Sequence, residues 1–300
     1  MNYSNQLNTT EQEKVSSTEC IAWLAVFITE AVSIVTLNIL TVIVFMKHRS
    51  LRKRSIYLVI NLAVVDMFVG GFAEVIQFIS IGGDCTFWQY NVAYGGIWHY
   101  VILLFLTTSL TNIAAISLER LHATFFPFKH RVIKKWIFGV IITVVWVTAA
   151  LITVVTVWLS YPTWPAFILI CLLVIFVSYV SISVKIHRGA HPQHHGGASR
   201  EKKLTKTLFI VTLVSLLMWL PFAIYHVLGL ATGVFSNLSM LVRFRILNSL
   251  IVLFFANSLV KPILYTFVMP EFKRALVSLF RRRAQQQGQV EVFPLRVVWM

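Results

Sequence analysis

Lys261 is the residue whose position most needs a chemical explanation. It lies in the last long apolar run, in a string that reads Asn-Ser-Leu-Val-Lys-Pro-Ile-Leu-Tyr and ends at Tyr265. A lysine in mid-membrane costs roughly 2.5–3.5 kcal/mol and usually faces a partner inside the protein. Asp66, in the second apolar run, is an acid that can supply this partner. The placement allows an ion pair, a proton or ion relay, or a lysine that snorkels or stays neutral.

The composition indicates that both residues belong to a helical membrane protein. The 300-residue chain is 58% hydrophobic and 12% charged, whereas a soluble domain carries about 25% charged residues. Runs of roughly 17–25 apolar residues can cross a bilayer, and we find seven candidates. They cover approximately residues 20–46, 55–82, 92–122, 135–160, 164–187, 203–232 and 244–268. We therefore expect an all-α membrane protein, with a seven-helix domain at residues 20–268 after a tail at residues 1–19.

The basic residues indicate how the chain is oriented. Of the 26 Lys and Arg residues, 22 fall in residues 47–54, 120–135, 185–206 and after 272. With seven spans, all four clusters lie on one side of the membrane. The positive-inside rule makes that side cytosolic and the N-terminus extracellular. Topology thus explains the net charge of +15, and we expect no nucleic-acid partner.

Cysteines and sequons agree with this orientation. Cys20 and Cys85 lie near the outer ends of the first two spans, where a disulfide can form, although two free thiols remain the alternative. Asn2, Asn8 and Asn237 each begin an Asn-X-Ser/Thr sequon on the predicted outer face and are expected glycosylation sites.

The segment after the last span predicts a further helix. Phe272, Leu276, Leu279 and Phe280 share one face of it, with basic residues around them. We expect an amphipathic helix at residues 269–283 on the inner leaflet and an unstructured cytoplasmic tail at residues 284–300. Residues 191–197 contain three histidines between Gly and Pro, which favours a flexible linker over a metal site. We predict no metal and no cofactor.

Polar motifs occur once per span in a fixed order. The second span contains Asn-Leu-Ala-Val-Val-Asp ending at Asp66, the third ends Ser-Leu-Glu-Arg at Arg120, and the sixth contains Met-Trp-Leu-Pro ending at Pro221. Asn38, Trp146, Tyr179 and Pro262 with Tyr265 complete the set. It resembles the rhodopsin-like (class A) G-protein-coupled receptors over residues 20–282. The resemblance implies a plasma-membrane receptor that binds an extracellular ligand and activates a heterotrimeric G protein.

The resemblance also implies a switch at the inner end of the bundle. Arg120 is expected to bind an acid in the inactive state, either the adjacent Glu119 or Glu201 at the start of the sixth span. In the active state it is expected to swing toward Tyr179 and Tyr265. Pro221 kinks the sixth span, and Trp219 beside it is expected to form the floor of a ligand pocket.

Lys261 departs from the family pattern, which has Asn there. Asp66, Ser109, Asn257 and Ser258 match positions that commonly hold a sodium ion in the family, with Asn38 nearby. We hypothesise that the Lys261 ammonium pairs with Asp66 and displaces sodium. A retinal-binding receptor is not expected, because the corresponding lysine position here is Phe255.

Other departures narrow the ligand without naming it. Gly95 stands where the usual outer cysteine is expected, the usual proline of the fifth span is replaced near Cys171, and Ile102 stands where amine receptors carry an aspartate. These absences give a weak similarity to the melanocortin, cannabinoid and lysophospholipid receptors. The expected pocket is apolar with a few donors. Its predicted residues are His99, Ile102, Leu106, Trp219, Phe222, His226, Ile251 and Phe255.

The sequence leaves small-molecule, lipid and peptide ligands open. Arg243 and Arg245 at the outer rim favour an anionic group, whereas Glu30, Glu74 and Gln77 favour a basic peptide. We predict no covalent chemistry and hence no enzyme. The alternative function is a transporter or channel that uses Asp66 and Lys261 as a proton or ion relay. A membrane hydrolase comes third, because it needs a metal set that the spans lack.

Overall fold

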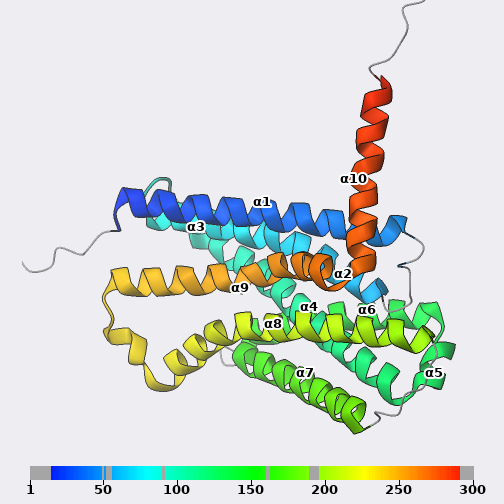
Figure 1. Cartoon of the computed structure of the whole chain (residues 1–300). Coiled ribbons are helices and arrows are strands. Elements are labelled where there is room, and N and C mark those ends of the chain that lie inside the picture. The colour runs from blue at the N-terminus through cyan, green and yellow to red at the C-terminus, as the bar shows by residue number, and fades with distance from the viewer. Residues whose placement is uncertain are drawn as a thin grey trace, which may run out of the picture.

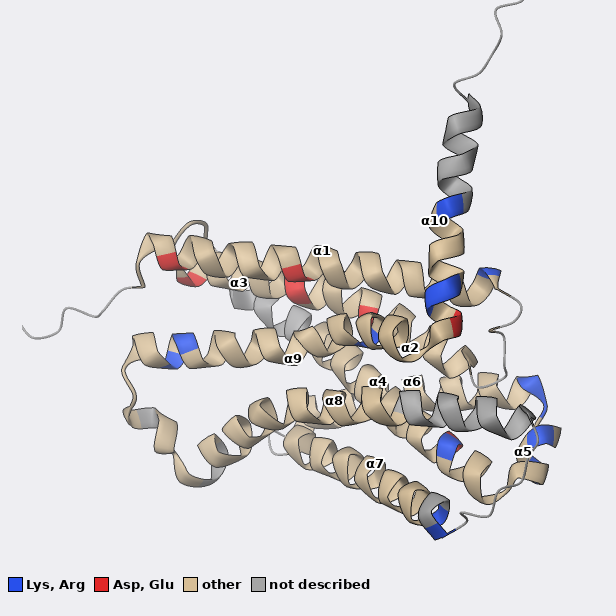
Figure 2. Cartoon of the chain, viewed as in Figure 1, with Lys and Arg blue, Asp and Glu red and all other residues tan. Residues whose placement is uncertain are grey.

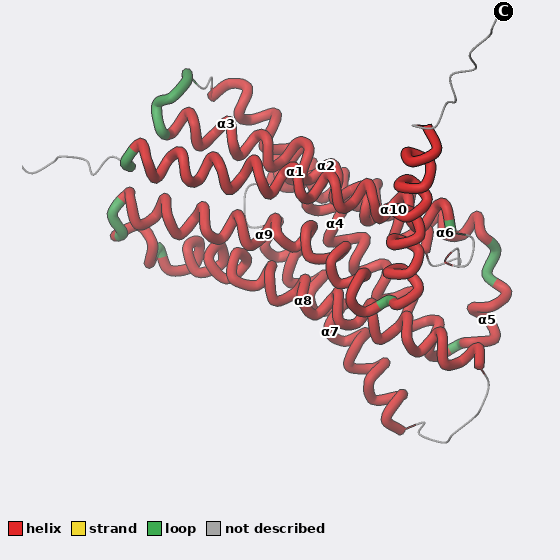
Figure 3. Tube along the Cα trace, turned by 45° about the horizontal axis from the view of Figure 1, so that its top comes forward, coloured by secondary structure: helices red, strands yellow, loops and turns green. Residues whose placement is uncertain are grey.

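The apolar runs form helices because a helix satisfies its own backbone hydrogen bonds inside a bilayer. The computed structural model describes residues 15–48, 51, 56–89, 92–159, 163–188 and 196–290. Within these ranges the chain is helical with short turns and contains no strand, as Figure 3 shows. Seven helical segments are long and apolar enough to cross a membrane, which confirms the predicted fold class.

The helices follow one another with short connections. The first half contains α1 (Ser17–Lys47), α2 (Ile56–Phe68), a π-helical segment η2 (Val69–Ala73), α3 (Glu74–Asp84), α4 (Val92–Phe125) and α5 (Pro127–Val132). The second half contains α6 (Lys135–Leu159), α7 (Thr163–Arg188), α8 (Gly196–Thr232), η3 (Val234–Asn237), α9 (Met240–Val268) and α10 (Pro270–Val290). Because α2, η2 and α3 are continuous, they form a single span from Ile56 to Asp84.

The bundle is built around α4. This helix packs against α2, α6, α7 and α8, while α1 packs against α2, α3 and α9, and α8 against α9. Figure 1 shows α1, α9, α8 and α7 running side by side along the bundle. The arrangement brings α2, α4 and α9 together at the centre, where Asp66, Ser109 and Lys261 lie.

Local sequence signals explain several features of the helices. Ser16 caps α1 by accepting a hydrogen bond from the Glu19 backbone N–H at 3.2 Å, and Ser239 caps α9 in the same way. Pro221 lies inside α8 and Pro262 inside α9. Each proline removes one backbone hydrogen bond from its helix and favours a kink.

Charged residues are distributed unevenly between the two ends of the bundle. In Figure 2, the ribbon positions of Lys and Arg gather at the end that carries α5 and the start of α10, and a smaller group lies at the opposite end, at the start of α9. The structure therefore puts the predicted basic side at the α5 end. The other end carries the start of α1 and the loop around η3.

Two boundaries differ from those expected. The predicted linker at residues 191–197 ends earlier, because α8 begins at Gly196; residues 189–195 lie outside the described ranges. The C-terminal helix begins at Pro270, one residue after the expected start, and continues to Val290, so residues 284–290 are helical and the predicted tail was wrong there. Arg, Ala and Gln are good helix formers, which accounts for the extension.

Aromatic packing holds the start of α10 on the bundle. The centroid of the Phe272 ring lies 5.1 Å from the ring centroid of Phe45 on α1 and 6.1 Å from that of Tyr265 on α9. Phe280, which we expected on the same face, is 50% exposed. Beyond its first turns α10 points away from the bundle (Figure 1).

Candidate functional site

The centre of the bundle contains a buried ion pair between Lys261 on α9 and Asp66 on α2. The lysine Nζ lies 2.9 Å from each of the two carboxylate oxygens. Asp66 is 0% and Lys261 1% exposed. This is the contact that the sequence predicts, and it excludes a lysine that snorkels to the membrane surface.

Two serines complete the polar shell of this pair. Ser109 on α4 donates to Asp66 Oδ1 at 3.1 Å and accepts from Lys261 Nζ at 3.1 Å. Ser258 on α9 donates to the same carboxylate oxygen at 2.9 Å. The pair therefore joins three helices, and its charges are compensated by hydrogen bonds as well as by each other.

Two asparagines lie close to this shell with different roles. Asn38 on α1 donates to the backbone carbonyl of Ser258 at 3.1 Å and so ties α1 to α9. Asn257 is buried, and its side-chain oxygen receives no hydrogen bond from the described residues. Most of the predicted polar core is thus in contact with Asp66 or its neighbours. Asn257 is buried on the same helix but is not among the described hydrogen-bond partners of Asp66.

At the α5 end of the bundle, Arg120 and Glu119 form a second buried pair. Arg120 donates from Nη2 to Glu119 Oε1 at 2.7 Å and from Nε to the other carboxylate oxygen. His130 on α5 also contacts Glu119, with Nε2 at 2.7 Å from Oε1. The contact between Glu119 and His130 therefore joins the end of α4 to α5. The sequence did not predict this role of His130.

Tyr179 and Tyr265, which were predicted to receive Arg120 in the active state, contact other residues in this arrangement. The Tyr179 hydroxyl lies 3.0 Å from the hydroxyl of Thr212, which links α7 to α8. Tyr265 packs edge-on against Phe45. Glu201 belongs to α8, but its side chain lies outside the described residues, so the expected Arg120–Glu201 contact is not tested.

An aromatic layer lies on α8 and α9 between the ion pair and the end of the bundle opposite α5. The ring centroids of Trp219 and Phe254 lie 4.6 Å apart in a tilted arrangement, and the Phe222 centroid lies 4.7 Å from that of Phe254 and 4.4 Å from that of His226. Trp164 on α7 meets Phe222 edge-on at 6.1 Å. The layer can recognise an apolar ligand that offers a hydrogen-bond acceptor, because the buried Trp219 Nε1 has no acceptor among the described residues.

Comparison with known proteins identifies the architecture. The family profile described as "7 transmembrane receptor (rhodopsin family)" matches residues 37–164 and 158–265, which is more than half of the chain. The chain belongs to this family.

Individual relatives are distant. The chain is 24% identical to the alpha-1A adrenergic receptor of Rattus norvegicus, over 84% of this chain and 66% of the relative. It is 24% identical to the substance-K receptor of Homo sapiens, over 69% and 60%, and 22% identical to the neuromedin-K receptor of Rattus norvegicus, over 81% and 60%. The chain thus spans slightly under two thirds of these relatives' length.

Within this rhodopsin-family protein, the predicted pocket residues are only partly gathered in one place. Trp219, Phe222 and His226 belong to the aromatic layer. Leu106 and Phe255 are buried, and Ile102 and Ile251 are partly buried against the core. The side chain of His99 lies outside the described residues. Phe254 and Trp164 were missed, because apolar residues at helical spacing do not distinguish a site from a core.

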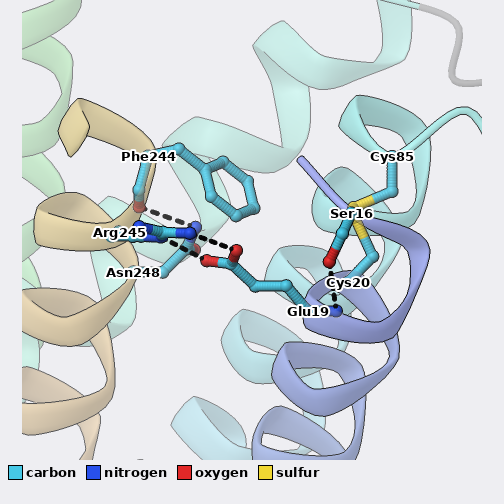
Figure 4. The surroundings of a disulfide bond; sticks show 7 residues. All are labelled: Ser16, Glu19, Cys20, Cys85, Phe244, Arg245 and Asn248. Atoms are coloured by element: carbon cyan, nitrogen blue, oxygen red, sulfur yellow. Dashed lines mark hydrogen bonds and ion pairs between the residues drawn. A yellow bond between two sulfur atoms is a disulfide. The ribbon is translucent and has the colours of Figure 1, made fainter. Parts of the chain in front are cut away.

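The end opposite α5 is fastened by a disulfide and an ion pair. Cys20 on α1 is bonded to Cys85 at the end of α3, with the Cα atoms 6.1 Å apart. The two cysteines therefore form a disulfide and are not free thiols. Figure 4 shows Arg245 reaching across to Glu19 near this disulfide, with Nε 2.8 Å from Oε1. Arg245 therefore already has an acid partner within the protein.

The glycosylation predictions fall in different parts of the chain. Asn237 is exposed at the end of η3, between α8 and α9. Asn2 and Asn8 lie outside the described residues. All three remain predictions.

Proposed function

We propose that this protein is a G-protein-coupled receptor that binds an extracellular ligand inside its helical bundle and activates heterotrimeric G proteins. Its membership of the rhodopsin family supports the class of function. The observation that carries the activation step is the buried contact of Arg120 with Glu119 at the α5 end. This contact holds the arginine inside a closed bundle.

Activation follows from the way α8 can move. Pro221 weakens the helix next to the aromatic layer, so ligand binding against Trp219 and Phe222 can favour a state in which the start of α8 is displaced. A ligand shifts this equilibrium only as far as it binds the displaced state more tightly. The opened end, with Arg120 released toward Tyr179 and Tyr265, would then receive the G protein.

The ion pair gives this receptor an unusual core. Family members commonly hold sodium among residues that correspond to Asp66, Ser109, Asn257 and Ser258. Lys261 supplies a positive charge to the same carboxylate. In our proposal the lysine replaces sodium as the cation that stabilises the closed bundle.

Orientation and location belong to the same proposal. The basic α5 end faces the cytosol and the N-terminus is extracellular, in the plasma membrane, because positive charges favour the cytosolic side. The apolar residues at the start of α10 then lie near the inner leaflet.

The ligand remains open between a small molecule, a lipid and a peptide. The aromatic layer favours an apolar group. The relatives carry the names of different ligands at nearly the same identity, so similarity does not choose among them. Transport through the Asp66–Lys261 pair is not favoured, because both side chains are almost fully buried and already bound to each other.

Nucleotide exchange on purified heterotrimeric G proteins tests this function. The receptor, reconstituted in lipid nanodiscs, is incubated with a panel of G-protein classes, first alone and then with lipid and peptide libraries. We expect accelerated exchange on at least one class, and its loss in Arg120→Ala. Substrate flux in proteoliposomes together with no exchange on any class would contradict the proposal.

A further inference from the structure

Glu30 on α1 and Glu74 at the start of α3 form a second buried acidic pair, separate from Asp66. Glu74 is 0% and Glu30 7% exposed. α1 packs against α3, and the two carboxyl groups are close enough to interact with each other. None of their four oxygen atoms receives a hydrogen bond from a donor among the described residues. Such a pair requires an explanation, because buried polar groups are normally hydrogen-bonded.

Tight packing between α1 and η2 fixes the pair. A Cβ at Gly70 would lie 2.8 Å from the Ile34 side chain and 3.1 Å from the backbone oxygen of Ala31, so only glycine fits without a shift. This contact adjoins Glu30 in the sequence of α1. The π-helical turn contains an extra residue compared with an α-helix, which rotates the following residues and turns Glu74 toward α1.

No charged side chain that the structure describes is bonded to the pair. Described charged residues also lie on the outer and central parts of the helices around the pair. They are Glu19, Asp66, Asp84, Arg243, Arg245 and Lys261. Arg245 binds Glu19 and Lys261 binds Asp66. On α4, Tyr100 is exposed and the side chain of His99 lies outside the described residues. Among the charged groups that the structure describes, each carboxyl interacts with the other.

We propose that Glu30 and Glu74 form a proton-binding site, in which the two carboxyl groups share one proton at neutral pH. Two adjacent carboxylates in an apolar interior repel each other and are both poorly solvated. A shared proton replaces the repulsion with a hydrogen bond, removes one charge and supplies the missing donor. The ligand of this site is the proton itself.

The site makes the protein sensitive to alkaline pH. In the unfolded chain both glutamates are ionised at neutral pH, because the free side chain titrates near about 4.3. The folded state then binds one proton more than the unfolded state, so stability falls as pH rises. One extra bound proton raises the unfolding equilibrium constant about tenfold per pH unit. When the proton leaves, repulsion acts across the tight α1–η2 contact.

Unfolding measured against pH tests the site. Wild type and Glu30→Gln/Glu74→Gln are unfolded in detergent from about pH 6 to about pH 9, a range in which free glutamate in water does not titrate. We expect a loss of stability in wild type at rising pH that is absent from the double variant, since two amides cannot bind or lose this proton. Glu19→Gln removes an acid from the rim of the same helix and should keep the wild-type slope.

Infrared spectroscopy gives a second readout that does not depend on unfolding. Wild type should show a protonated-carboxyl band at neutral pH that disappears at alkaline pH. Either single variant should shift this band and the double variant should remove it. Identical bands and identical pH slopes in wild type and double variant would overturn the proposal. If the double variant does not fold, the infrared band of the single variants decides: a band that is unchanged in both would overturn the proposal. Neither readout involves a G protein, so this result and the test of receptor function are independent.

Discussion

The ammonium group of Lys261 lies 2.9 Å from both carboxylate oxygens of Asp66, although 195 positions separate the two residues in the chain. The contact closes the middle of the bundle between α2 and α9, and Ser109 extends it to α4. The buried lysine of the last span is therefore matched by a buried acid of the second span.

Coupling between Asp66 and Lys261 is the first prediction. Asp66→Asn leaves a buried ammonium and Lys261→Asn a buried carboxylate, and removing one partner of such a pair typically costs about 3–5 kcal/mol. The double variant leaves no unpaired charge, so its loss should be well below the sum of the single losses. Unfolding of the purified variants in detergent measures all three.

A matched control is available at the rim of the bundle. Arg245 and Glu19 form an ion pair in which the arginine side chain is 53% exposed. Removing this pair should change stability by no more than about 1 kcal/mol. Additive losses at Asp66 and Lys261 would mean that the two residues act independently.

The disulfide is predicted to be a major stabilising element. Cys20 and Cys85 are 65 positions apart, and the chain-entropy estimate for a loop of this size is about 4 kcal/mol. Cys20→Ser and Cys85→Ser should each lower the melting temperature, and the double variant should be no worse than either. The difference from wild type should vanish in reducing agent. A difference that persists after reduction would indicate that the cysteines stabilise by packing alone.

The close contact of α1 with η2 predicts opposite effects at two neighbouring glycines. Gly70→Ala forces a Cβ against Ile34, and overpacking of this kind typically costs about 1–3 kcal/mol. At Gly71 the nearest atom to an added Cβ is 3.9 Å away, so Gly71→Ala should be neutral or stabilising by up to about 1 kcal/mol. Melting temperatures of the two variants compare them directly, and equal effects would contradict the packing argument.

The contacts of Glu119 predict which variants raise basal signalling. Glu119 is the common partner of Arg120 and His130. Glu119→Gln should weaken the hold on Arg120 and raise ligand-independent nucleotide exchange. His130→Ala leaves the Arg120–Glu119 contact in place and should have a smaller effect. The reverse order would mean that α5, and not the charge pair, keeps the receptor closed.

Much of this architecture is readable from the sequence. Long apolar runs and clustered basic residues predict spans and sides, since both depend only on local composition. The partner of Lys261 is predictable too, because a buried charge needs a partner and Asp66 matches the acid that the family resemblance puts in the same cavity. The helical extension of α10 to Val290 was missed, since a Gln-rich segment resembles a tail although its residues favour a helix.

Features that depend on the register between spans were not predictable. The π-helical turn before Glu74 decides which side of the helix faces α1, and two glycines in the sequence do not reveal it. The burial of Glu30 against Glu74 follows from that turn. In the same way, the sequence places Cys20 and Cys85 on one side of the membrane but does not say that their Cα atoms approach to 6.1 Å.

The most direct test of the central claim, that Lys261 replaces sodium at Asp66, compares melting temperatures in sodium chloride and potassium chloride at equal ionic strength. Wild type should melt at the same temperature in both salts. Lys261→Asn should be more stable in sodium, by about 1.4 kcal/mol when the ion is about tenfold above its dissociation constant, and Asp66→Asn/Lys261→Asn should lose that effect. A clear stabilisation of wild type by sodium would contradict the account.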